Sequence, residues 1–103
     1  MKLKLTPRAE READRIDAWW RARRASAGDL FLTELEVAMA LVLTSPGVGA
    51  PYGTHEGALV QRVLLPRTQH HIYYVIEGEL IGVVSIWSAL RRRGPRFPRG
   101  DLP

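Results

Sequence analysis

The stretch "HHIYYVIEGELIGVVSIWSALRRR", residues 70–93, decides the fold of this chain. Residues 70–76 are rich in isoleucine and tyrosine, which favour strands, and the short segment 77–79 has a glycine at its centre, as tight hairpin loops do. The apolar run 80–87 supplies the second strand of this hairpin, and the Gly-Pro pair at 94–95 ends the regular structure. We therefore expect two antiparallel strands followed by a run of arginines.

Two further strands are predicted upstream of this hairpin. Residues 58–65 (ALVQRVLL) are β-branched and apolar, and a turn at 66–69 joins them to the hairpin. Residues 2–5 (KLKL) alternate polar and apolar side chains with the period of a strand. The sequence thus predicts one N-terminal strand and a meander of three.

Two helices are predicted between these strands. Thr6 and Pro7 are a good helix start, because the hydroxyl can accept from a free amide and proline suits the first turn; this helix should run to about Arg24. A second helix should start near Asp29 and stop in the proline- and glycine-rich segment 44–53. Each has apolar residues at helical spacing: Ala9, Ala13, Ile16 and Trp20 in the first, and Leu32, Leu35, Met39 and Val42 in the second.

The predicted order, β-α-α-β-β-β, indicates an α+β domain in which an antiparallel helical hairpin packs on an antiparallel β-meander. We expect a single domain over residues 1–95 and a basic tail rich in proline and arginine over residues 96–103. A chain of 103 residues can bury one modest core.

Composition excludes several classes of function. The chain has no cysteine, so it forms no disulfide and has no thiol nucleophile or cysteine-ligated zinc. His70 and His71 are consecutive on a strand and face opposite sides, so we expect no metal site, and without a glycine-rich phosphate loop we expect no cofactor. Nothing in the first 15 residues resembles a signal peptide and no apolar run could span a bilayer, so we expect a cytoplasmic protein.

Charge is uneven along the chain, whose formal net charge is +4. Residues 25–57 hold four acidic residues and no lysine or arginine, so the positive charge lies at the two ends. A basic C-terminal segment of this kind suggests an acidic partner, either phosphate or a carboxylate-rich protein. Its five arginines are Arg91, Arg92, Arg93, Arg96 and Arg99.

Strand alternation assigns the candidate functional face. Ile72 and Tyr74 should face the helices, whereas His71 and Tyr73 should face away from them, joined by either Arg62 or Gln61 from the preceding strand. We expect this second face to be open, with the arginines after the last strand at its edge. On the first helix, Trp19 either widens the core or forms a surface patch for a partner, since tryptophan is common among binding hot spots.

Three segments carry a resemblance to a known family: "LTPRAEREADRIDAWW" (5–20), "LTSPGVGAPYG" (43–53) and "HIYYVIEGELIGVVSIWSALRRR" (71–93). In their order and spacing, over about residues 3–95, they resemble the RelE/ParE toxins of bacterial type II toxin–antitoxin systems. The resemblance implies the α+β fold above, a toxin that inhibits growth, and a cognate antitoxin that wraps it in a hetero-oligomer.

The family divides into two mechanisms. RelE-like toxins are metal-independent endoribonucleases that cut mRNA on the translating ribosome, and here the resemblance implies Arg62, His71 and Arg91 as the catalytic set. That set lacks a second basic residue on 58–65 and any tyrosine after Tyr74. ParE-like toxins poison DNA gyrase and lack the nuclease residues. Because the nuclease set of this chain is incomplete, the sequence favours a ParE-like mechanism. In "WSALR" Ser88 stands where a ParE-like histidine is expected, although Arg91 is retained. A non-toxic binding module from a degenerate toxin copy is the third alternative.

Two sets of binding residues follow. For the nucleic acid or protein target we predict Arg67, Tyr73, Arg91, Arg92, Arg93 and Arg96. For the antitoxin we predict Trp19 together with Arg91, Arg92 and Arg93.

Overall fold

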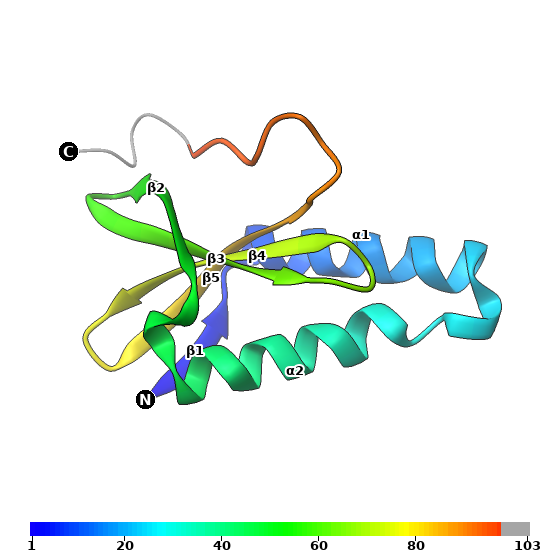
Figure 1. Cartoon of the computed structure of the whole chain (residues 1–103), viewed down its shortest axis with the longest axis horizontal. Coiled ribbons are helices and arrows are strands. Elements are labelled where there is room, and N and C mark those ends of the chain that lie inside the picture. Colours follow the sequence, from blue (N-terminus) through cyan, green and yellow to red (C-terminus); the bar gives the residue numbers. More distant parts are fainter. Residues whose placement is uncertain (98–103) are drawn as a thin grey trace.

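The structure is a computed structural model that describes residues 1–97. A twisted sheet with strand order β1-β5-β4-β3-β2 is covered on one face by two helices (Figure 1). β1 runs parallel to β5, and the other neighbouring strands are antiparallel. The elements are β1 (Lys2–Leu5), α1 (Pro7–Arg23), α2 (Leu30–Thr44), β2 (Ala50–His55), β3 (Ala58–Leu65), β4 (His70–Glu77) and β5 (Leu80–Ser88).

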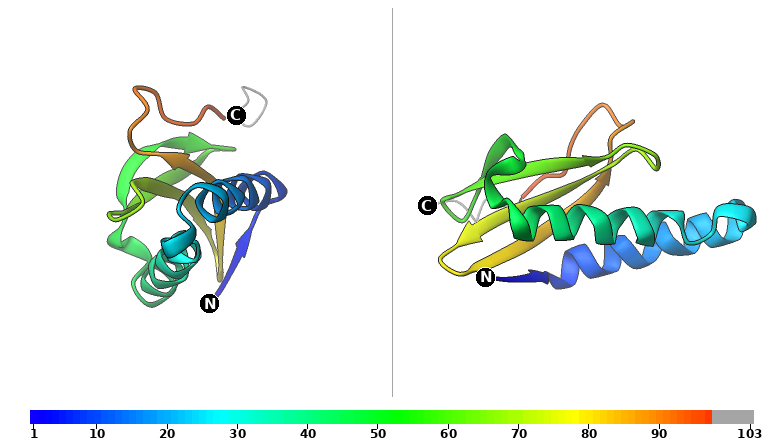
Figure 2. Two further views of the ribbon diagram at one scale, coloured as in Figure 1. Left: turned by 90° about the vertical axis from the view of Figure 1, so that its right-hand side faces the viewer. Right: turned by 60° about the horizontal axis from the view of Figure 1, so that its bottom comes forward.

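Helix α1 begins where the sequence predicts. The Thr6 side chain accepts a hydrogen bond from the amide of Ala9 at 3.2 Å, and Pro7 occupies the first turn. Ala9 and Ala13 are buried, so the helix lies close to the sheet. A short 3₁₀ turn at Ala25–Ala27 then reverses the chain into α2, and the two helices run antiparallel, side by side (Figure 2). The predicted helical hairpin is confirmed.

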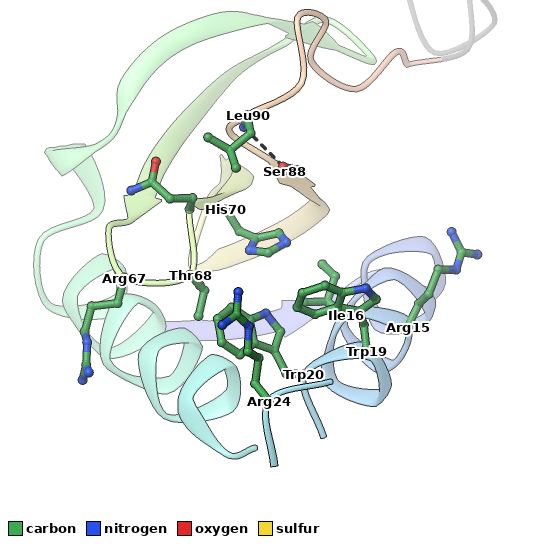
Figure 3. Close-up of a pocket in the computed structure, with 11 residues that line it drawn as sticks. Arg15, Ile16, Trp19, Trp20, Arg24, Arg67, Thr68, His70, Ser88 and Leu90 are labelled. Atoms are coloured by element: carbon green, nitrogen blue, oxygen red, sulfur yellow. Dashed lines mark hydrogen bonds between the residues drawn. The ribbon is translucent and has the colours of Figure 1, made fainter. Parts of the chain in front are cut away.

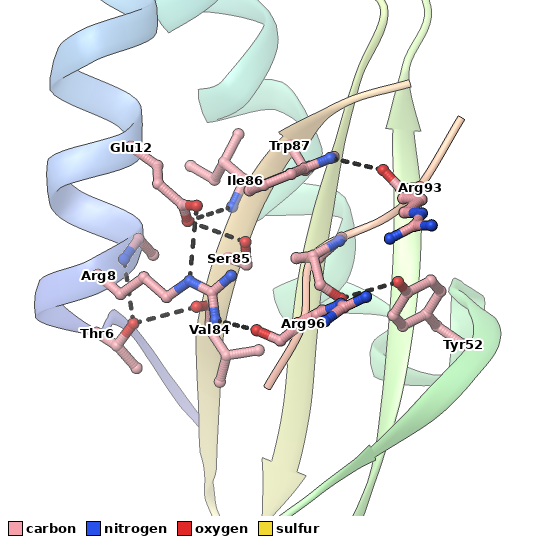
Figure 4. Close-up of polar contacts among 12 residues, drawn as sticks. Thr6, Arg8, Glu12, Tyr52, Val84, Ser85, Ile86, Trp87, Arg93 and Arg96 are labelled. Carbon is pink, nitrogen blue, oxygen red and sulfur yellow. Dashed lines mark hydrogen bonds and ion pairs between the residues drawn. The ribbon is translucent and has the colours of Figure 1, made fainter. Parts of the chain in front are cut away.

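Glu12 fixes α1 to the sheet. β1 pairs with β5 only as far as Val83, so the next part of β5 has no strand on that side. The Glu12 carboxylate takes this place and accepts hydrogen bonds from the Ser85 hydroxyl at 2.9 Å and the Ile86 amide at 3.1 Å. It also pairs with Arg8 at 3.6 Å (Figure 4). A charged side chain thus completes the hydrogen bonding of the edge of β5.

The main core lies between the helices and the sheet. On β4 it includes Ile72 and Tyr74, as the alternation predicts. On α2 the predicted Leu35 and Val42 are buried, whereas the predicted Leu32 and Met39 are only partly buried against the core. The buried residues of α2 are Phe31, Leu35, Ala38 and Val42.

The structure adds one strand to the predicted order. β2 lies within a segment whose Pro51 and Gly53 indicated a loop, and it pairs with β3 at the edge of the sheet with a register shift between these two residues. Proline is tolerated there because an edge strand has amides that need no partner. The buried Tyr74 hydroxyl positions this strand, since it accepts from the Gly49 amide at 2.9 Å and donates to the Pro46 carbonyl at 2.7 Å. The α+β class is confirmed, with a meander of four strands.

The second face of the sheet is not open as expected. Residues 89–97, here called the C-terminal strap, turn back after β5 and cross this face (Figure 1). Three side chains bind backbone carbonyls of the strap: Trp87 donates to Arg93 at 2.8 Å, Tyr52 to Pro95 at 3.0 Å and Arg8 to Arg96 at 2.8 Å (Figure 4). The start of the predicted tail therefore packs on the domain, while Arg99 and the rest of the tail lie outside the described residues.

Candidate functional site

A small core lies beneath the strap, where exposed polar groups were expected. It contains Val60, Tyr73, Val75 and Val84, and Phe97 of the strap packs against it. Tyr73 is 1% exposed, and its ring centroid lies 4.7 Å from that of Tyr52. Burial raises the pKa of the Tyr73 hydroxyl, and a hydrogen bond from Arg62 partly offsets this effect. The predicted contact of Tyr73 with a target is incompatible with this burial.

The implied catalytic residues share a region of this face. Arg62 pairs with Tyr73 across β3 and β4, and His71 pairs with Trp87 across β4 and β5. The Arg91 guanidinium lies 4.7 Å from the centroid of the Trp87 ring. Arg62 is therefore the residue that joins the second face.

Gln61 faces the helices and donates to the Gly49 carbonyl at 2.9 Å. Gly49 belongs to the segment that precedes β2, so Gln61 has a structural role on the helix side of the sheet.

Each member of the catalytic set is engaged within the fold. The Arg62 guanidinium lies 5.3 Å from the Tyr52 ring centroid, and Arg91 stacks on Trp87 as above. Burial lowers the pKa of His71, and the positive charge of Arg62 lowers it further, so both effects favour the neutral imidazole. A neutral histidine can accept a proton, but it adds no positive charge for a phosphate.

No tyrosine hydroxyl supplies the missing acid. Tyr52 donates to the strap, Tyr73 is buried, and Tyr74 holds the segment before β2. Because the chain has only these three tyrosines, the hydroxyl that the nuclease chemistry uses has no counterpart on this face.

The strap presents a row of cations to solvent. Arg91, Arg92 and Arg93 are exposed, as is Arg96. Their backbone is held in place, because Trp87 and Arg8 bind the carbonyls of Arg93 and Arg96. This row was predicted from the sequence, but its attachment across the sheet was not.

A second candidate surface lies at the far end of α1. Trp19, predicted to lie at the edge of the helix face, is 43% exposed and borders a pocket of about 500 Å³. Trp20, interpreted as core, packs partly buried against the main core and also lines this pocket, and Arg67 lies on the rim. Trp19 meets Trp20 edge to face, with ring centroids 5.6 Å apart. The pocket was missed because it also needs Leu90, a residue of the strap, whose return toward α1 the sequence does not predict.

An apolar groove of about 380 Å³ runs between α2 and β3. β2 pairs with β3 only as far as Arg62, so the groove borders the part of β3 without a strand on its outer side. Its exposed apolar residues are Val37, Leu41 and Leu64.

Within residues 1–97, no group of three or more histidine, aspartate or glutamate side chains is arranged to hold a metal ion. No helix in that part of the chain has the length and apolar character needed to cross a membrane.

Comparison with known families decides the assignment. Residues 3–93 match the family described as ParE toxin of type II toxin–antitoxin system, parDE. The chain belongs to the ParE toxin family. Membership implies an antitoxin partner, as in the parDE systems that name the family. A search of curated proteins finds no match.

The fold of this ParE-family toxin is also found among solved structures. A chain described as the chromosomal ParDE TA system from P. aeruginosa superposes with a TM-score of 0.62 at 19% identity. The match covers 85% of this toxin and 95% of that chain. At this identity the likeness concerns the fold, and it agrees with the observed α+β architecture.

Proposed function

We propose that this ParE-family toxin acts in the bacterial cytoplasm, inhibits growth by poisoning DNA gyrase rather than by cutting mRNA, and is neutralised by its antitoxin in a hetero-oligomer. The observation that carries the choice of mechanism is the strap over the second face of the sheet. In the nuclease alternative, mRNA would have to reach that face.

The geometry of the charged groups supports the same choice. A metal-independent cut needs cations directed at the phosphate, because negative charge develops there in the transition state. Here Arg62 and Arg91 lie against aromatic rings of their own domain. The RelE-like alternative retains one favourable feature, since His71 is close enough to Arg62 for the arginine to lower its pKa.

Arg92 and Arg93 are our candidates for contact with the gyrase–DNA complex, because Arg91 packs on Trp87 and also belongs to the implied nuclease set. They are exposed, and the hydrogen bond from Trp87 to the Arg93 carbonyl depends on backbone, not on the arginine side chains. Replacing both by alanine should leave the strap in place while it removes two positive charges. DNA phosphates are the natural partner for such a row.

Substitutions on the two surfaces separate the mechanisms. We expect Arg62→Ala and His71→Ala each to retain growth arrest, whereas the double variant Arg92→Ala, Arg93→Ala should lose it. Lys2→Ala with Lys4→Ala is the matched control, because it removes the same amount of positive charge from exposed residues of β1. If Arg62→Ala or His71→Ala abolishes growth arrest in a folded protein, the nuclease alternative is favoured instead, since losing one such group slows a reaction by about 10²–10³-fold.

A further inference from the structure

The pocket beside Trp19 is formed by three segments that are distant in the sequence. They are the second half of α1, the turn between β3 and β4, and the residues just after β5 (Figure 3). Ile16 and Trp20 give it an apolar wall, Leu90 stands across from them, and His70 lies between these two sides. Here this site is called the tryptophan pocket; its lining residues used below are Ile16, Trp19, Trp20, Arg24, Arg67 and Leu90.

Two large apolar side chains of this pocket are exposed to solvent. Leu90 is 78% exposed and Trp19 is 43% exposed. Exposed apolar groups gathered in a hollow with a polar rim mark sites of protein interaction. Trp19 is also held in position, between the edge of Trp20 and the Arg23 guanidinium, 5.6 Å from its ring centroid. A rigid exposed tryptophan loses little entropy on binding, which suits a hot spot.

A carboxylate borders the pocket at its Arg67 end, where Glu34 accepts hydrogen bonds from the amides of Arg67 and Thr68 and from the Thr68 hydroxyl. The charged side chains in the lining itself are all positive. The lining contains Arg15, Arg24 and Arg67 and, within the described residues, no carboxylate. The ion pairs of α1 join Arg8 to Glu12 and Arg21 to Asp17, so those carboxylates are already paired with other arginines. Figure 3 shows Arg15 and Arg67 at opposite ends of the rim, with Arg24 beside Trp20 between them. A ligand that crosses this rim meets positive charge on both sides of an apolar hollow.

We propose that the tryptophan pocket receives a large apolar side chain from an acidic segment of the antitoxin, with carboxylates before and after it opposite Arg24 and Arg67. Charge complementarity with the positive rim requires a negatively charged partner segment. The aliphatic groups of Ile16 and Leu90 favour an apolar side chain as its anchor over a nucleotide. The inference rests on one part of the proposed function, neutralisation by an antitoxin, and does not depend on the identity of the toxin's target. The pocket adjoins the strap through Leu90, but its lining includes none of the strap arginines.

The test uses the full-length toxin and the antitoxin encoded beside it, with affinity measured by calorimetry. Trp19→Ala should weaken the complex by about 30-fold or more, the loss typical of a hot-spot tryptophan. Leu90→Ser should also weaken it, and because Leu90 is 78% exposed this change leaves the toxin folded. Arg24→Glu combined with Arg67→Glu should slow association, most at low salt. The matched control, Lys2→Glu with Lys4→Glu, makes the same charge change at exposed residues of β1 and should leave the affinity within about threefold.

Three outcomes would overturn the inference. The first is unaltered antitoxin affinity in the pocket variants together with a loss in Arg92→Glu, Arg93→Glu, which would place the antitoxin on the strap arginines alone. The second is a change in self-association of the free toxin in the pocket variants, with antitoxin affinity unaltered, which would assign the pocket to a second copy of the chain. The third is unaltered antitoxin affinity with loss of binding to gyrase and DNA. Antitoxin binding is measured without gyrase, so a failure of the gyrase proposal leaves this test intact.

Discussion

Glu12 offers the sharpest test of how the fold is held together. Its carboxylate is the acceptor for the Ser85 hydroxyl and the Ile86 amide, and its side chain is only 13% exposed. Glu12→Ala leaves both donors without a partner at a place where Ser85 is fully buried. Hydrogen bonds to a charged group contribute about 1.5–3 kcal/mol each and are not additive, so we expect a loss of about 2–4 kcal/mol.

Urea unfolding of the purified toxin measures this loss as a lower midpoint with an unchanged slope. For a domain of this size each kcal/mol corresponds to about 4–8 °C in melting temperature, so the shift should be unmistakable. Glu12→Gln keeps an oxygen that can accept one of the two hydrogen bonds, and it should lose about half as much. Asp14→Ala is the control, because Asp14 is exposed on the same helix. The reasoning is refuted if Glu12→Ala costs no more than Asp14→Ala.

Three further predictions concern other contacts of the fold. Tyr74→Phe leaves the buried Gly49 amide unpaired and should cost about 1–3 kcal/mol in urea unfolding, whereas an undiminished midpoint would show that this hydroxyl is dispensable. Gly94→Ala places a methyl group against the Tyr52 hydroxyl, so the strap should loosen and trypsin should cut its arginines faster than in the parent toxin. Glu34 has a pKa below 4.5: burial raises this pKa, but hydrogen bonds from Thr68 and the Arg67 amide lower it more. Its stabilising effect is therefore present above pH 4.5 and is lost as the pH falls through the folded pKa. The urea midpoint of the parent toxin should exceed that of Glu34→Gln at pH 6, and this difference should shrink toward pH 3.

The sequence predicted the elements whose local signals agree with the fold. Thr6 and Pro7 begin α1 as the capping preference requires, and the alternation on β4 separates Tyr73 from Tyr74 correctly. β2 was missed because proline and glycine are the usual signals of a loop. Its strand conformation depends on pairing with β3 and on the buried hydroxyl of Tyr74, which are contacts between distant segments.

The candidate site was harder to predict than the fold. Periodicity shows that Arg62 and His71 share a face, but it cannot show that residues 89–97 return to cover that face. The strap is attached by side chains of Arg8, Tyr52 and Trp87 to backbone carbonyls, an interaction that leaves no sequence motif. The tryptophan pocket likewise depends on bringing Leu90 opposite α1.

The measurement that tests the central claim most directly compares two activities of one purified toxin preparation. Supercoiling and DNA cleavage by gyrase are followed in one reaction, and mRNA on translating ribosomes is followed in the other. The account predicts accumulation of cleaved DNA held by gyrase, with intact mRNA. Codon-dependent cuts in ribosome-bound mRNA, with gyrase unaffected, would contradict it.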